Sequence, residues 1–206
     1  VDIGRFAQAD DAKVREIQMR YEYPIVLAVG RLEKEKSFDA VLSAWKQVVA
    51  AGLKTRLLII GEGSEQARLE KIIAEDFKDG SAVLLGKRAP DDLPPYYHAA
   101  SVFVLASQSE SFGKVLVEAG ASGIPCVATQ TAGASEIIQQ GSTGYLVPLG
   151  DADSLAARII ELVRDPAKAK EIGSKARARC TALYDGKKVT EEVLRLWHKA
   201  ARRRKP

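Results

Sequence analysis

The chain has 206 residues, of which 46% are hydrophobic and 28% are charged. This length and composition are typical of a single globular domain with a sizeable core. No run of 18 apolar residues occurs, so we expect neither a membrane-spanning helix nor a signal peptide. The two cysteines, Cys126 and Cys180, form no Cys-x-x-Cys pair, which favours a reduced, cytoplasmic setting.

The net charge of +4 comes from the carboxyl end of the chain. Five basic residues and no acid occur among residues 199–206, so the remainder is close to neutral. Such a tail can attract anionic lipid or nucleic acid, but a solvated end without a partner is the plainer interpretation. We therefore expect no nucleic-acid partner, and we keep peripheral contact with the inner face of a membrane as a hypothesis.

The first half of the chain predicts strands that alternate with helices. Because the chain opens at Val1 and its only methionine is Met19, we also expect it to be part of a longer protein. Short apolar runs that end in glycine indicate strands, and apolar residues at helical spacing indicate helices. The expected order is a loop at 1–6, a helix at 7–21, a strand at 25–29, a helix at 38–49, a strand at 57–60, a helix capped by Ser64, a strand at 82–85 and a short helix at 96–100.

The second half of the chain continues this alternation. Its expected elements are a strand at 102–105, a polar loop at 107–111, a helix at 112–123, a strand at 124–129, a loop at 130–135, a strand at 145–147, a helix at 151–163 capped by Asp151, a helix at 167–181 and a last helix with the basic tail at 186–206. The pattern predicts a parallel sheet covered on both faces. With right-handed crossovers this is a doubly wound α/β fold, formed by one domain over residues 1–206.

Two glutamates mark the loop and helix that follow the strand at 102–105. Glu118 has apolar neighbours on most sides, and an unpaired carboxylate is costly to bury, so we expect this residue to have a function. Glu110 precedes the helix, where the free amides near Phe112, Gly113 and Lys114 form an anion site. Glu118 would lie roughly 8 Å along the helix. We hypothesise that the amides hold a diphosphate, Glu118 a ribose diol and Glu110 the group beyond the phosphates.

Three other loops at strand ends carry unusual residues, each with a plainer alternative. Arg31 and Lys36 suit a diphosphate, or they belong to a charged surface loop. The turn at 61–63 permits close approach of a ligand to the backbone, or it is an ordinary turn. Leu85 and Gly86 would border a flat base, or they end a strand.

Several patterns argue against other chemistries. The glycines at 61–63 do not complete Gly-x-Gly-x-x-Gly, and Gly113-Lys114 is not a phosphate-loop motif. His98 lies among bulky residues, which favours packing over catalysis, and His198 is expected on the surface of the last helix. No cluster has the spacing of metal ligands, and no nucleophile stands beside a base.

Taken together, the motifs resemble those of the carboxyl-terminal, donor-binding domain of a GT-B glycosyltransferase of family four, the glycosyl transferases group one. The resemblance covers nearly the whole chain and implies a Rossmann-like domain that forms the carboxyl-terminal half of a GT-B enzyme. The matching residues, in chain order, are Gly30-Arg31 with Lys36, Gly61-x-Gly63, Glu110-x7-Glu118, Gly123-x-Pro125 and Gly133 with Glu136. Ser37, Ala106, Ser111 and Ala132 depart from the family pattern around the expected sugar pocket.

The resemblance implies a role for each matching residue. Arg31 and Lys36 would hold the donor diphosphate and stabilise the leaving phosphate, and Glu110 would contact the donor sugar, so these three are the expected catalytic residues. The family retains the anomeric configuration, commonly without a metal, and no cofactor or metal is expected. The implied donor-binding residues are Gly30, Gly61, Gly63, Leu85, Gly86, Ser111, Phe112, Gly113, Lys114 and Glu118.

The implied function is transfer of a sugar from a UDP- or GDP-sugar to a glycan or a lipid-linked acceptor. The acceptor-binding amino-terminal domain would be missing, so we expect this chain alone to bind donor without transferring it, and residues 186–206 to pack on the missing domain. A sugar-nucleotide 2-epimerase of the same architecture and a non-catalytic nucleotide-binding module remain alternatives. A catalytic histidine in the appropriate loop would favour the epimerase, and none stands out.

Overall fold

The computed structural model of the chain describes residues 1–22 and 24–203. Its core is a six-stranded sheet in the order β3-β2-β1-β4-β5-β6, and every pair of neighbouring strands is parallel. This arrangement confirms the predicted doubly wound α/β fold. The strands are β1 Ile25–Val29, β2 Arg56–Ile60, β3 Ala82–Leu84, β4 Val102–Leu105, β5 Cys126–Thr129 and β6 Gly144–Val147.

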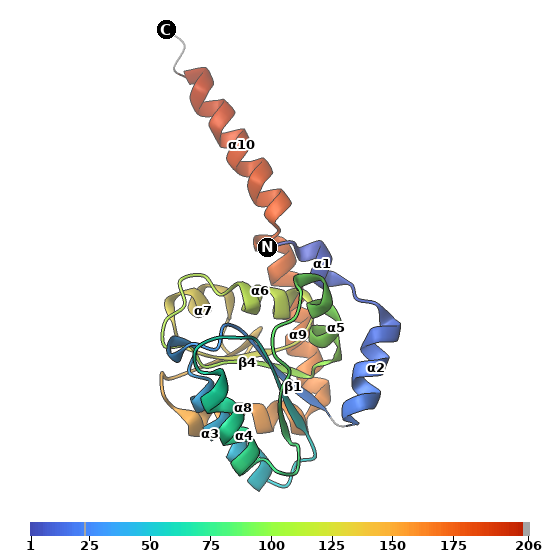
Figure 1. The fold of residues 1–206 in the computed structure, drawn as a ribbon. Coiled ribbons are helices and arrows are strands. Elements are labelled where there is room, and N and C mark those ends of the chain that lie inside the picture. The colour runs from blue at the N-terminus through green and yellow to red at the C-terminus, as the bar shows by residue number, and fades with distance from the viewer. Residues whose placement is uncertain (23, 204–206) are drawn as a thin grey trace.

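Helices cover both faces of the sheet (Figure 1). The α-helices in the described residues are α1 Ile3–Ala7, α2 Asp11–Tyr21, α3 Phe38–Ala50, α4 Gln66–Asp76, α5 Leu93–Ala99, α6 Lys114–Ala121, α7 Ala132–Ile137, α8 Ala152–Arg164, α9 Pro166–Leu183 and α10 Gly186–Arg203. Two short 3-10 helices, η1 Lys34–Lys36 and η2 Pro90–Asp92, lie in the loops after β1 and β3.

The central strands are apolar at every position because both of their faces are buried. In β1, Val26 and Ala28 join the core layer that contains Trp45 of α3. Leu27, between them, points to the opposite layer, which also contains Tyr97 of α5 and residues of α1 and α6. The period of two along the strand therefore divides the core into two layers, one on each side of the sheet.

Two segments expected as loops are short helices. Residues 1–6 contain most of α1, whose first turn is capped by Asp2 and whose Phe6 is buried. The loop expected at 130–135 becomes α7, which begins where the Thr131 hydroxyl accepts the amide of Ala134. Both predictions were wrong because these helices are too short to show an apolar period, and only the capping residue signals them.

Two predicted helix starts need correction. Ser64 does not cap α4, because its hydroxyl donates to the carboxylate of Glu33 in the loop after β1. The helix α6 begins at Lys114 rather than near Phe112, since Gly113 has the left-handed φ of 88° and ends the loop. The predicted cap of α8 is confirmed, because the Asp151 carboxylate accepts the amide of Ser154.

The last helix, α10, projects away from the sheet and its flanking helices (Figure 1). Several of its apolar side chains are exposed, among them Val193 and Leu196, and Trp197 is 77% exposed. The expectations for His198 and for the charges of the basic tail fall outside the residues whose side chains are described. Within the described residues, no helix is both long enough and apolar enough to cross a membrane.

Candidate functional site

The strand order reverses between β1 and β4, and ligands of open α/β sheets bind outside the carboxyl ends of the strands at such a point. The loops after these two strands are joined there. The backbone amide of Gln108 donates to the carbonyl of Glu35 at 2.8 Å. Beside this bond, the Lys36 ammonium forms an ion pair with Glu110, with 2.7 Å between Nζ and Oε2. The fold therefore brings together two of the three residues expected to be catalytic.

The Lys36–Glu110 pair is largely shielded from water. The side chains of Lys36 and Glu110 are only 15% and 16% exposed. A carboxylate and an ammonium at this depth stabilise each other, and loss of either leaves the other charge poorly solvated. The pair therefore fixes the positions of both side chains at the edge of the crevice.

The loop that carries Glu110 is held from behind by α7 and β5. The amide of Gly133 donates to the carbonyl of Glu110 at 2.8 Å, and the Thr129 hydroxyl donates to the carbonyl of Ser107 at 2.6 Å. A Cβ at Gly133 would lie 2.7 Å from the Glu110 oxygen and 2.8 Å from the amide nitrogen of Phe112. Gly133 is thus needed so that α7 can pack on this loop, a structural role that the sequence alone did not reveal.

The helix α6 starts at the same edge of the crevice. Gly113 is its N-cap, and no side chain among the described residues caps it. The first amides of a helix have no partner within it, and the helix dipole adds partial positive charge at this end. Ser111, Phe112 and Lys114 are exposed around this terminus. The start of α6 is therefore suited to bind a phosphate group.

Glu118 lies about 6 Å further along α6 than Lys114, from the rise of 1.5 Å per residue. Its carboxylate accepts a hydrogen bond of 2.9 Å from the hydroxyl of Tyr97 on α5. Tyr97 is fully buried, with its ring packed edge-on against Phe6 and stacked on Phe103. Burial raises the pKa of Glu118 above its ordinary value, and the Tyr97 hydrogen bond and the charge of Lys114 oppose that shift. The sequence did not predict this tyrosine.

The loop after β1 carries Arg31, which the structure places at the surface. Its guanidinium forms an ion pair of 2.6 Å with Glu35, and the Arg31 side chain is 70% exposed. Exposed pairs of this kind contribute little to stability and exchange partners readily. Arg31 is thus available to a ligand at the crevice, although it does not contact Lys36 or Glu110 in any bond that the structure records.

The glycines after β2 are required by the fold itself. A Cβ at Gly61 would overlap the carbonyl oxygen of Gly30, and a Cβ at Gly63 would overlap the backbone of Leu32. The amide of Leu32 donates to the carbonyl of Glu62 at 2.8 Å, so the loops after β1 and β2 lie against each other. These contacts explain both glycines without a ligand, and direct contact with a donor stays a prediction.

A pocket of about 350 Å³ lies at the carboxyl ends of β1 and β2. Its lining includes three of the expected residues, Gly30, Arg31 and Gly61. Neither Gly63 nor the pair Leu85 and Gly86 is among its lining residues. Charged residues that the sequence analysis did not select complete the wall, namely Glu62, Lys87 and Arg88. The Lys87 ammonium pairs with the Glu62 carboxylate across the rim.

The titratable side chains of the described residues also bear on the question of a metal site. Among the described residues, no group of three or more His, Cys, Asp and Glu side chains is placed to hold a metal ion. The ring of His98 is partly buried, and its Nε2 lies 2.8 Å from the carbonyl oxygen of Phe6. This contact confirms the interpretation of His98 as a packing residue.

A family model described as glycosyl transferases group 1 matches residues 10–179. The chain belongs to this family. N-acetyl-alpha-D-glucosaminyl L-malate synthase of Bacillus anthracis is 28% identical to the domain over 90% of this chain and 49% of that protein. A GDP-mannose-dependent alpha-(1-6)-phosphatidylinositol monomannoside mannosyltransferase of Mycolicibacterium smegmatis is 30% identical over 86% of this chain and 49% of its own length.

A solved structure shows the same fold. The Anabaena protein Alr3699/HepE, in complex with UDP and glucose, superposes with a TM-score of 0.86 over 96% of this chain and 55% of that one. At 23% identity, this likeness establishes the fold. The chain spans about half the length of the curated relatives it matches. The expected family and fold are thus confirmed.

Proposed function

We propose that this domain is the donor-binding half of a retaining glycosyltransferase that takes a nucleoside-diphosphate sugar. The observation that carries the proposal is that the loop and helix after β4 bear three features in succession. These are the uncapped start of α6, the shielded Lys36–Glu110 pair and the carboxylate of Glu118. They match in order the phosphates, the transferred sugar and the ribose of such a donor.

The chemistry of each group supports this assignment. The amides at the start of α6 would bind the diphosphate, and the hydroxyls of the ribose would donate to Glu118. In the reaction, the bond between the anomeric carbon and the diphosphate oxygen breaks, and a hydroxyl oxygen of the acceptor bonds to that carbon and loses its proton. Lys36 and Arg31 would stabilise the negative charge that develops on the leaving nucleoside diphosphate. Glu110, held by Lys36, would face the sugar.

The identity of the donor is proposed at the level of its class. The mannosyltransferase relative of Mycolicibacterium smegmatis is named as GDP-mannose-dependent, which supports a nucleoside-diphosphate sugar as donor. The same name includes a phosphatidylinositol mannoside, which is compatible with a glycan or lipid-linked acceptor. No match reported above is named as an epimerase or as a non-catalytic module, so the transferase is favoured over both alternatives.

We also propose that α10 packs on a second domain that completes the enzyme. The curated relatives are about twice as long as this chain, and α10 presents exposed apolar side chains away from the domain core. An exposed apolar stripe of this kind is costly unless another surface covers it. In this arrangement the second domain would carry the acceptor, and the present chain alone would bind donor without transfer.

Calorimetric titration of the 206-residue chain with UDP, GDP and ADP tests the donor site. We expect one of these nucleotides to bind, and Glu118→Ala to weaken that binding by about 1.5–3 kcal/mol, the range for hydrogen bonds to charged groups. Glu161→Ala is the matched control. Glu161 also accepts a tyrosine hydroxyl, from Tyr145, but it lies on α8, on the other side of the sheet.

The outcomes separate the proposal from its alternatives. Equal weakening by both substitutions would indicate a general loss of structure and would count against Glu118 as a ribose ligand. No binding to a folded chain, repeated on the longer protein with the same result, would contradict the donor site altogether. Binding that appears only in the longer protein would show that the second domain completes the site.

A further inference from the structure

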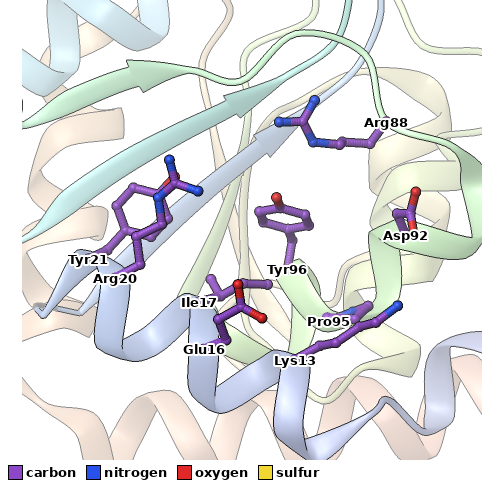
Figure 2. Close-up of a pocket in the computed structure, with 9 residues that line it drawn as sticks. All are labelled: Lys13, Glu16, Ile17, Arg20, Tyr21, Arg88, Asp92, Pro95 and Tyr96. Atoms are coloured by element: carbon purple, nitrogen blue, oxygen red, sulfur yellow. The ribbon is translucent and has the colours of Figure 1, made fainter.

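A second pocket lies between α2 and α5 (Figure 2), and none of the residues proposed to contact the donor lines it. Its volume is about 270 Å³. The cavity exists because α2 lies against the domain without burying a single residue fully. The side chains of Ile17 and Tyr21 on α2 are only partly buried. The space between α2 and α5 therefore stays open.

The floor of this pocket is an amphipathic aromatic surface. Figure 2 shows Tyr96 of α5 in the middle of the pocket, with its hydroxyl turned toward Arg88. Ile17 and Pro95 add apolar surface beside the ring. A tyrosine face next to apolar side chains suits a small, flat body that carries polar groups at its edge.

Two arginines from different parts of the chain converge on this floor. Arg20 comes from α2 and Arg88 from the loop after β3. Within the described residues, neither guanidinium forms an ion pair: Arg88 donates to the carbonyl of Lys87, and Arg20 lies 5.7 Å from the ring centre of Tyr21. Burial raises the pKa of Tyr21, and the charges of Arg20 and Arg88 oppose this shift. Two such cations can hold a phosphate or carboxylate bidentately.

Carboxylates complete the wall of the pocket. Glu16 of α2 and Asp92 of the η2 turn line it together with Lys13. Figure 2 shows Glu16 on the other side of Tyr96 from Arg88. Ionised carboxylates accept hydrogen bonds and repel bare anions. The wall is therefore suited to a ligand that has hydroxyl groups at one end and a negative charge at the other.

We propose that the pocket between α2 and α5 binds an anionic sugar of the size of a hexose monophosphate. The phosphate would lie between the guanidinium groups of Arg20 and Arg88, and the apolar face of the sugar would rest on the ring of Tyr96. The hydroxyls at the far end would donate to Glu16 and Asp92. A free phosphate would leave the aromatic floor unused and would face these two carboxylates, and a neutral sugar would leave both arginines without a partner.

Arg88 links this pocket to the proposed donor site, because it lines both cavities. A ligand that draws its guanidinium toward α2 removes a positive charge from the pocket at the ends of β1 and β2. The nucleotide and the anionic sugar should therefore weaken each other's binding, and by thermodynamic linkage they do so by the same factor. This step rests on the proposed function, whereas the binding of the anionic sugar does not.

Calorimetric titration of the 206-residue chain with glucose 6-phosphate tests the pocket, with glucose and inorganic phosphate as comparison ligands. We expect saturable binding of glucose 6-phosphate that Arg20→Gln weakens about tenfold or more, since one charged contact is lost. Arg15→Gln, the same change on the same helix, should leave binding intact because Arg15 does not line the pocket. Both arginines are exposed, so neither substitution should disturb folding.

Three results would overturn the proposal. They are the absence of saturable binding, equal affinities of wild type and Arg20→Gln, and equal affinities for inorganic phosphate and glucose 6-phosphate. If no nucleotide binds either to this chain or to the longer protein, but glucose 6-phosphate binding depends on Arg20, the donor site fails and the pocket stands. If the nucleotide binds with the same affinity at saturating glucose 6-phosphate, the link through Arg88 is refuted.

Discussion

Glu110 and Glu118 belong to the same loop-helix unit, yet the protein stabilises their carboxylates in different ways. Glu110 pairs with the ammonium of Lys36, and both side chains are about 15% exposed. Glu118 is bonded to the uncharged hydroxyl of Tyr97 and lies in an environment that disfavours its negative charge. The charge of Glu110 is thus balanced by an ammonium, whereas the described side-chain donor to Glu118 is an uncharged hydroxyl.

This difference indicates how each carboxylate would meet a ligand. In the proposed site, a donor phosphate that approached Lys36 would compete with Glu110 for the same ammonium, and until then the ion pair would hold the ammonium in position. Glu118 has two oxygens with about four lone-pair sites and, in the hydrogen bonds described, one side-chain donor. Two neighbouring hydroxyls would supply donors that the protein does not, which is the arrangement of a ribose diol.

Removal of the cation from the Glu110 pair should have the largest effect. Lys36→Met leaves Glu110 shielded from water without its counter-charge. Breaking a buried pair costs about 3–5 kcal/mol, and the residual exposure reduces this to about 2–3 kcal/mol of unfolding free energy at pH 7. Urea denaturation followed by circular dichroism measures the change. By contrast, Glu118→Gln should leave stability unchanged or raise it, since it removes a disfavoured charge.

Two variants sharpen this test. Lys34→Met removes an exposed lysine of the same 3-10 turn and should change stability by less than about 0.5 kcal/mol. The double variant of Lys36→Met with Glu110→Gln should recover much of the loss, because no unpaired charge remains. If Lys36→Met alone proved neutral, the pair would be a surface contact and the contrast between the two glutamates would disappear.

A smaller effect is expected from the partner of Glu118. Tyr97→Phe removes one hydrogen bond and keeps the ring that packs on Phe6 and Phe103. We expect nucleotide affinity to fall by about 0.5–1.5 kcal/mol, because the carboxylate is no longer held toward the ribose. The affinity for a 2′,3′-dideoxy nucleotide, which lacks the diol, should not change. Calorimetry with both ligands provides the comparison.

The chain contains a control for this experiment. Tyr145→Phe removes a hydroxyl that donates to Glu161 at 2.8 Å, far along the chain on β6 and α8. It should leave both nucleotide affinities intact. Equal losses for ribose and dideoxy nucleotides in Tyr97→Phe would mean that Tyr97 supports the fold of the site rather than the position of Glu118.

The sequence predicted which loops meet at the switch point of the sheet, but not how their residues are paired. Alternation of strands and helices places the loops after β1 and β4 at one edge of a parallel sheet, so Arg31, Lys36 and Glu110 were expected there. The pairing of Lys36 with Glu110 joins residues 74 positions apart, and the Tyr97–Glu118 bond depends on how α5 packs beside α6. Distances of this kind follow from the packing of helices, which no local pattern records.

The glycines show a similar limit. Their spacing identified the turns at Gly61 and Gly63 and the loop at Gly133, because glycine allows backbone to approach closely. What approaches is the protein's own backbone, from Gly30, Leu32 and Glu110. A sequence shows that close contact is needed at such a position, but the partner is known only when the neighbouring loop has been placed.

The last comparison concerns the pH dependence of the two tyrosine-bonded glutamates, Glu118 and Glu161. Burial raises the pKa of Glu118. Between the ordinary pKa and the raised pKa, the folded state binds more protons than the unfolded state, so the free energy of unfolding falls as pH rises. For Glu161, hydrogen bonds from Lys168 and Arg158 outweigh burial and lower the pKa to about 2. The contribution of Glu161 to the free energy of unfolding is therefore lost as pH falls from 4.5 to about 2. Each slope is below about 1.4 kcal/mol per pH unit, since one proton is involved.

The two slopes are measured as differences in unfolding free energy between wild type and each Glu→Gln variant across the acid range. As pH rises through its titration, Glu118→Gln should gain stability relative to wild type. As pH rises from about 2 to above 4.5, Glu161→Gln should lose stability relative to wild type, because only wild type gains the ionised carboxylate. If the slopes had the same sign, the charge of Glu118 would be as well stabilised as that of Glu161. Glu118 would then not need the hydrogen bonds of a ribose, even if the nucleotide bound at this edge of the sheet.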